Sequence, residues 1–154
     1  MRFIFILMFL IQEGTYLAQS TIFYDKTWQR AIEKAVQLNK FDPLEKVLLT
    51  KSAILNIATS EEQKSKLLRM FNTGYAMSRD LFDKQMDYHI KRGLKNKKSK
   101  VIEMRINGLD NEVSKTIFIR VSSGGKNYVL RFRNCFLSGE QVFTTGEIEI
   151  LVEK

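Results

Sequence analysis

The spacing of apolar residues changes near residue 100, and this change restricts the possible folds more than any other feature. Over residues 68–82 apolar side chains recur at steps of three and four, which is the period of a helix with one buried face. Over residues 102–106 apolar and polar side chains alternate, as in a strand with one buried face. The order predicts an α+β fold, with a helical half over residues 20–95 and an antiparallel sheet half over residues 96–154.

Capping residues divide the helical half into several helices. Candidate N-caps precede four segments with helical character: Asp25, Asp42, Thr50 and Ser60. Pro43 strengthens the second signal, which predicts a short helix through Leu49. The last helix is expected to be the longest, from about residue 61 to 92, and to pack on the sheet through a broad apolar face. This face is expected to be widened by Met70, Met77, Leu81 and Tyr88.

Four segments with strand-like alternation make up the sheet half. Their inward apolar residues are expected to be Ile102, Met104 and Ile106; Ile117, Ile119 and Val121; Tyr128, Leu130 and Phe132; and Ile148, Ile150 and Val152. Turn sequences rather than long crossovers separate consecutive strands, which predicts antiparallel pairing. Gly146 predicts a bulge or bend that curves the sheet. The expected architecture is therefore a long helix packed on a curved antiparallel sheet of about four strands.

The N-terminus has the layout of a secretory signal peptide. Arg2 precedes an apolar run over residues 3–11, which is shorter than the roughly 20 residues that a transmembrane helix needs. We expect cleavage near Ala18, so that residues 1–19 are a signal peptide and residues 20–154 form a single exported domain, periplasmic or secreted. The alternative is that the apolar run is a buried first strand or helix.

The composition is that of a globular protein with an excess of positive charge. Hydrophobic residues make up 44% and charged residues 27% of the 154 residues, which disfavours disorder and a multi-span membrane protein. The formal net charge is +8 at pH 7, and residues 20–154 carry all of this excess. Such a charge favours anionic partners. After export these would be an anionic glycan, a lipid surface or an acidic protein, rather than nucleic acid.

Basic residues are predicted to gather on the outer face of the sheet. They occupy positions opposite in parity to the inward apolar residues, together with one aromatic side chain: Arg105, Arg120, Arg131, Arg133 and Phe118. Arginines beside an aromatic ring can bind phosphate, sulfate or uronic-acid groups, so these five residues are the predicted ligand-binding site. The alternative is an ordinary solvated sheet face on which the arginines pair with Glu103, Glu147 and Glu149.

A second basic segment spans residues 91–100, Lys-Arg-Gly-Leu-Lys-Asn-Lys-Lys-Ser-Lys, and contains six lysines and arginines. Basic residues after a long helix complement the helix dipole and keep a connection solvated. The alternative is a true anion-binding patch.

The sequence offers little catalytic chemistry. Cys135 and His89 are the only cysteine and histidine, so an intramolecular disulfide is excluded and a cysteine–histidine pair is the sharpest enzymatic hypothesis. A packed thiol and a packed imidazole are favoured over it. No zinc, calcium or phosphate-loop spacing occurs, and we predict no metal, cofactor or catalytic residue. The sequence favours a non-catalytic binding or accessory module. The alternatives are a small enzyme with a pocket between sheet and helices, and a structural subunit of a cell-envelope assembly.

The chain also resembles a group of small, largely uncharacterised exported bacterial proteins. The similar segments are Leu49-Thr50-Lys51, Ser60-Glu61-Glu62, Ser122-Ser123-Gly124-Gly125-Lys126-Asn127-Tyr128 and Asn134-Cys135-Phe136-Leu137. The resemblance implies a cone in which a strongly curved sheet wraps helices, similar to cystatin-like and nuclear-transport-factor-like folds. It implies no function, because such folds serve binding proteins, enzymes and scaffolds alike.

Overall fold

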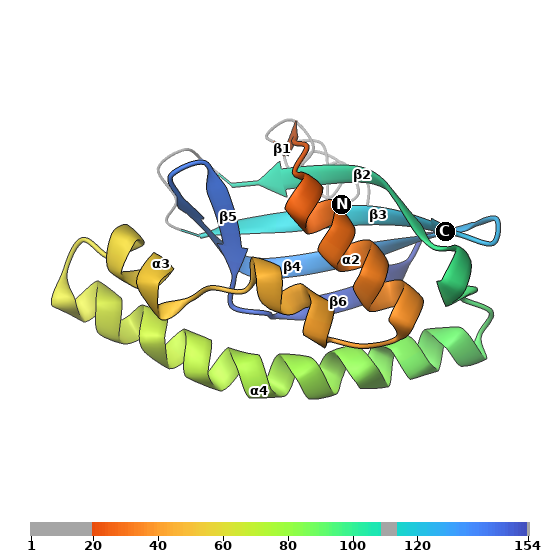
Figure 1. Ribbon diagram of the computed structural model, residues 1–154, viewed down its shortest axis with the longest axis horizontal. Helices are drawn as coiled ribbons and strands as arrows, with labels where there is room; N and C mark the ends of the chain where they lie inside the picture. The colour runs from red at the N-terminus through yellow and green to blue at the C-terminus, as the bar shows by residue number, and fades with distance from the viewer. Residues whose placement is uncertain (1–19, 109–113, 154) are drawn as a thin grey trace, which may run out of the picture.

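Helices cover one face of a curved, six-stranded antiparallel sheet (Figure 1). The computed structural model describes residues 20–108 and 114–153, so the predicted signal peptide lies outside the described residues. The predicted α+β class is confirmed, with the helices first and most of the sheet second. None of the helices within the described residues is both long and apolar enough to cross a bilayer.

The sheet is an antiparallel meander with additions at both edges. Its centre consists of β2 (Lys100–Asn107), β3 (Lys115–Ser123) and β4 (Lys126–Ser138), which pair in that order. Short β1 (Ser20–Ile22) pairs with β2 at one edge. Along its other edge, the 13-residue β4 pairs first with β6 (Ile148–Val152) and then with β5 (Gln141–Thr144).

The expectation of about four strands was therefore too low. The sequence did not indicate β1 and β5, which are three and four residues long. Segments of this length contain too few alternations to reveal a strand by period alone.

A bend separates the two partners of β4. Asn134 has a left-handed φ of +52°, and the register of β3 against β4 shifts beside it. Gly146, with φ of +93°, lies in the connection between β5 and β6 rather than inside the last strand. The chain therefore bends at Asn134 within β4 and at Gly146 in the connection between β5 and β6. A bend at Gly146 was predicted from the sequence.

Capping side chains begin three of the helices as predicted. Asp25 accepts hydrogen bonds from the amides of Thr27 and Trp28 at the start of α2 (Lys26–Leu38). Thr50 caps α3 (Lys51–Ile57), and Ser60 caps the long α4 (Glu61–Lys91), which agrees with the expected range of 61 to 92.

The signal at Asp42 predicted a short helix correctly, but Asp42 does not act as its cap. Residues Asp42–Val47 form a 3₁₀ helix, η1, and the Asp42 side chain makes no capping bond. Its carboxylate instead pairs with Arg79 of α4. A second short 3₁₀ helix, η2 (Asn96–Lys98), connects α4 to the sheet.

The main core lies between α2, α4 and the inner face of the sheet. The Trp28 ring packs edge-on against Phe132 with 5.1 Å between centroids, and its indole N–H donates to the Val142 carbonyl at 2.9 Å. Phe82 and Met86 of α4 are fully buried. The indole therefore anchors α2 to two strands at once.

The apolar face of α4 is narrower than expected. Met77, Leu81 and Tyr88 are 60%, 43% and 52% exposed. Helix α4 runs beside β6, which pairs with β4 along the edge of the sheet. Only a narrow stripe of the α4 surface therefore meets the core. Ile102 is likewise exposed, because a register shift between Val101 and Glu103 reverses the side-chain alternation at that point.

Candidate anion-binding surfaces

The structure brings the five predicted site residues to the outer face of the sheet. Strand register places Phe118 between Arg105 and Arg131, directly opposite both. Arg120 lies two residues further along β3, and Arg133 two residues along β4 from Arg131. The positions of these residues in their strands therefore predicted correctly that they share one face of the sheet.

Each of these arginines has a glutamate partner. Arg105 and Arg120 pair with Glu103, and Arg120 also pairs with Glu153 at 2.6 Å. These bonds join β2, β3 and the segment just after β6.

The same pattern continues along β4. Arg131 pairs with Glu149, to which it lies directly opposite, and Arg133 lies 3.2 Å from Glu149 and 3.7 Å from Glu147. Four arginines thus face four glutamates, so the site residues contribute no net charge. The geometry corresponds to the alternative of a solvated face with cross-strand pairs.

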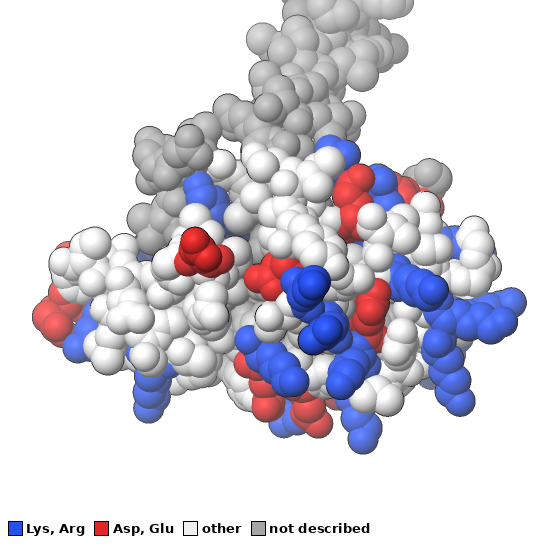
Figure 2. All heavy atoms as spheres, turned by 45° about the horizontal axis from the view of Figure 1, so that its top comes forward, with Lys and Arg blue, Asp and Glu red and all other residues white. Residues whose placement is uncertain are grey.

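The positive excess lies elsewhere, at the end of the molecule where α4 stops. We define the basic end as Lys91, Arg92, Lys95, Lys97, Lys98, Lys100 and Lys126. All seven side chains are exposed, and none lies within 4 Å of a carboxylate of the described residues. Figure 2 shows Lys and Arg side chains dominating one end of the face that it displays.

Three separate segments build the basic end. Lys126 opens β4, yet its Nζ lies only 3.7 Å from the point where a Cβ on Gly93 would stand. The Lys95 side chain runs over Gly124, leaving no room for a Cβ there. The β3–β4 hairpin is therefore in contact with the connection that follows α4, and the sequence run 91–100 gains a seventh cation.

Two acids near these cations have other partners: Asp87 lies four residues before Lys91, and Glu153 bonds through its backbone to Asn127, next to Lys126. Asp87 accepts a hydrogen bond from the Asn39 amide at 3.1 Å, and Glu153 pairs with Arg120. The Arg92 guanidinium stacks over the Tyr88 ring at 3.6 Å. The helix dipole of α4 amounts to about half an elementary charge at its C-terminus, far less than seven cations.

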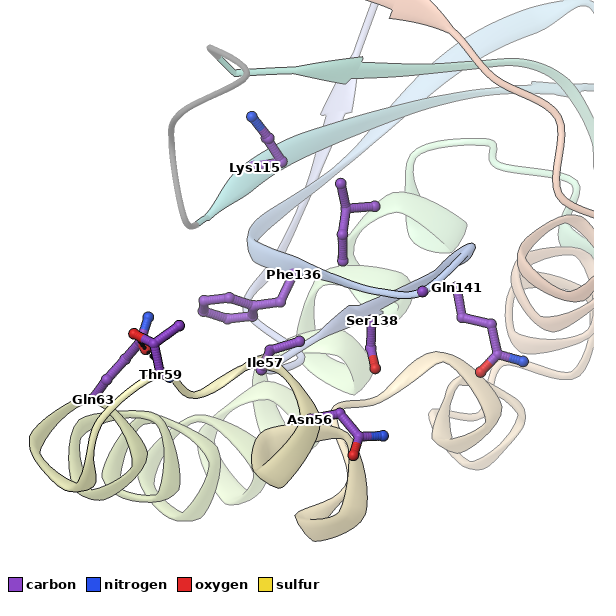
Figure 3. Close-up of a pocket in the computed structure, with 10 residues that line it drawn as sticks. Asn56, Ile57, Thr59, Gln63, Lys115, Phe136, Ser138 and Gln141 are labelled. Atoms are coloured by element: carbon purple, nitrogen blue, oxygen red, sulfur yellow. Dashed lines mark hydrogen bonds between the residues drawn. The ribbon is translucent and has the colours of Figure 1, made fainter.

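A pocket of about 630 Å³ opens between the α3–α4 junction and the β4–β5 hairpin (Figure 3). Its helical wall contains Asn56, Thr59 and Gln63, and its hairpin wall contains Ser138 and Gln141. Among the described residues that line it, Lys115 is the only side chain with a titratable group. The described part of the lining therefore contains no acid and base pair of the kind that hydrolytic chemistry needs.

A second pocket, of about 440 Å³, lies where α4 passes the bend in the sheet. Met70, Met77 and Leu81 form its helical wall, with Asn134 and Glu147 opposite. Glu147 accepts a hydrogen bond from the Asn134 side chain at 2.8 Å. This pocket also offers no second carboxylate among its described lining residues.

Cys135 and His89 do not form a pair. The His89 ring packs edge-on against Tyr128 at 5.7 Å, whereas Cys135 lies seven residues further along the same strand. At about 3.3 Å per residue, this separates them by roughly 20 Å. Burial raises the pKa of the Cys135 thiol to about 12, which makes it a poor nucleophile.

No group of three or more His, Cys, Asp or Glu side chains in residues 20–108 and 114–153 is placed to hold a metal ion. No protein-family model, curated protein or solved structure matches the chain. The resemblance to cone-shaped exported proteins therefore stays a prediction.

Proposed function

We propose that this protein is a non-catalytic binding module that contacts a polyanion through the basic end. The observation that carries the proposal is the concentration of seven exposed cations without carboxylate partners in the described structure. Cations held this close repel one another, and an anionic polymer that lies along them relieves this repulsion and releases its counterions.

An anionic glycan is the partner class that suits this surface best. The cations come from the end of α4, the connection through η2 to β2, and the start of β4, so a chain with regularly spaced negative groups can meet several of them at once. Lysine side chains are flexible, so lysines on a connection between elements can contact such a chain without holding it in one fixed geometry. In this proposal the paired arginines of the sheet face stabilise the sheet instead of binding the ligand.

We propose also that residues 1–19 direct export, which would bring the domain to envelope glycans. The motivation is the signal-peptide layout of the sequence, with Arg2 before the apolar run. Expression of the full chain in a bacterial host, followed by fractionation and N-terminal sequencing, tests this. A mature protein that begins near Gln19 or Ser20 supports export, and an intact Met1 in the cytoplasmic fraction contradicts it.

Binding is tested with a charge-reversed double variant and a matched control. Lys98→Glu/Lys126→Glu removes four units of net charge from the basic end. Lys51→Glu/Lys66→Glu makes the same change on exposed lysines at the start of α3 and α4, towards the opposite end of the molecule.

We expect affinity for an anionic polysaccharide to fall at least about tenfold in the first variant and much less in the second, and to weaken with salt in the parent protein. Equal losses of affinity in both variants would show that binding depends on net charge alone, and would contradict a binding site at the basic end. Arg120→Glu/Arg131→Glu tests the sheet face in the same assay, and anionic lipid vesicles replace the polysaccharide in a parallel titration. A loss confined to the sheet-face variant, or binding to vesicles alone, would overturn the proposal.

A further inference from the structure

A separate cluster of cations surrounds a small pocket between α2 and η1. Arg30 and Lys34 lie one turn apart on α2, Lys46 lies in the last turn of η1, and Ala31 and Pro43 complete the lining. The pocket volume is about 280 Å³. Figure 2 shows several blue side chains, with red ones among them, over the middle of the face that it displays.

The carboxylates nearest in sequence are all directed elsewhere. Glu33 accepts a hydrogen bond from the Val101 amide at 3.1 Å. Asp42 pairs with Arg79, and Glu45 accepts a hydrogen bond from the Tyr75 hydroxyl at 2.6 Å. Each of these three acids therefore bonds to a group on another element.

The three cations are left without a described carboxylate within 4 Å. Arg30 and Lys34 are like charges at i and i+4, an arrangement that disfavours the helix. A bound anion would turn this repulsion into attraction.

The lining favours one class of anion. A guanidinium can bind two oxygens of a phosphate or sulfate side by side, and two ammonium groups supply further charged donors. Ala31, which is 2% exposed, and Pro43, which has no amide N–H, provide an apolar base that strengthens these interactions. The volume holds one such group with part of its organic substituent.

We propose that Arg30, Lys34 and Lys46 form a discrete site for a single tetrahedral oxyanion, a phosphate or sulfate group, independent of the basic end. The site takes one group with fixed stoichiometry, whereas the basic end contacts a polymer through many exposed lysines.

The test is a titration of the full chain with inorganic phosphate and, separately, sulfate, followed by the chemical shifts of backbone amides at constant ionic strength. We expect saturable shifts confined to residues 30–46, with acetate producing none. Lys34→Ala and Lys46→Ala should each raise the dissociation constant for phosphate at least about fivefold. Lys40→Ala, an exposed lysine outside the pocket lining, is the matched control and should leave it unchanged.

Two further results test the proposed oxyanion site. Lys98→Glu/Lys126→Glu should leave phosphate binding intact, so the site can survive failure of the proposed function. Shifts that do not saturate, that spread over all exposed lysines, or that persist in both Lys34→Ala and Lys46→Ala would overturn the proposal. All three side chains are exposed, so we expect these variants to fold. The amide spectrum shows whether a variant has lost its fold, and in that case Lys34→Gln replaces Lys34→Ala.

Discussion

The side-chain amide of Gln85 pairs with the backbone of Ile150 as an adjacent strand would. Its Oε1 accepts the Ile150 N–H at 2.6 Å, and its Nε2 donates to the Ile148 carbonyl at 3.2 Å. One turn later, His89 Nε2 lies 3.0 Å from the Ile150 carbonyl. Two residues of α4 thus bond to backbone groups on the side of β6 that faces away from β4. These bonds protect this edge of the sheet from pairing with another chain.

Replacing Gln85 should therefore destabilise the fold. Gln85→Ala leaves the Ile150 N–H without its partner, and we expect the free energy of unfolding to fall by about 1–3 kcal/mol. Urea denaturation followed by circular dichroism measures the change. Asn72→Ala removes an exposed side-chain amide from the same helix and should change stability by less than about 0.5 kcal/mol. Equal effects in the two variants would mean that the bond to β6 contributes nothing.

Gly146 lies in close contact with α4 and with the segment after η1. A Cβ there would stand 3.1 Å from Leu48 Cδ2 and 3.3 Å from the Ser78 side chain, at a φ of +93°. Gly125 has a similar φ of +84° but nothing within 4 Å. The two glycines thus differ in their surroundings more than in their backbone.

We expect Gly125→Ala to cost about 1 kcal/mol from backbone strain alone. Gly146→Ala should cost about 1–3 kcal/mol more, because it adds overpacking to the same strain. Thermal and urea unfolding of both variants measure the difference. Similar losses would show that the bend can open to accept a methyl group.

Much of the fold could be predicted because it depends on local signals. The capping bonds of Asp25, Thr50 and Ser60 connect residues at most three positions apart. The change of period separates helices from strands without any long-range information. Asp42 shows the limit: its sequence context is that of an N-cap, but Arg79, 37 residues away, takes its carboxylate.

The candidate sites depend on register and packing, which a single sequence does not fix. Parity placed Arg131 on the outer face, but its pairing with Glu149 follows from the alignment of β4 with β6. The basic run after α4 was visible, whereas the arrival of Lys126 depends on the β3–β4 hairpin. The pocket beside Lys46 requires η1 to fold back on α2, and no sequence spacing indicates that contact.

The ion pairs of the sheet face predict a pH dependence. A hydrogen bond from Arg105, with the charges of Arg105 and Arg120, holds the pKa of Glu103 below its ordinary value, although partial desolvation opposes this shift. Because the folded pKa is the lower one, the stabilisation is complete above the unfolded pKa of about 4.3 and is lost as the pH falls through the folded value.

We expect the Glu103 carboxyl to titrate below pH 4.3 in an NMR titration and to return towards its ordinary value in Arg105→Gln. The variant should also lose less stability than the parent between pH 6 and pH 3. Lys51→Gln, which removes an exposed cation from α3, should leave the Glu103 midpoint unchanged. A Glu103 midpoint at the ordinary value in the parent protein would contradict the pairing.

Cys135 should be unreactive as long as the protein is folded. Its side chain is fully buried, its Sγ lies 3.6 Å from the Phe132 carbonyl, and burial raises its pKa to about 12. The raised pKa favours the neutral thiol, so the associated stability is present below the unfolded pKa of about 8.5 and declines as the pH rises towards 12. At pH 8 we expect a thiol reagent such as 5,5′-dithiobis(2-nitrobenzoic acid) to react with one equivalent in urea but only at the rate of unfolding in buffer. Fast reaction of the native protein would mean that β4 opens at this point and that the thiol is available for chemistry.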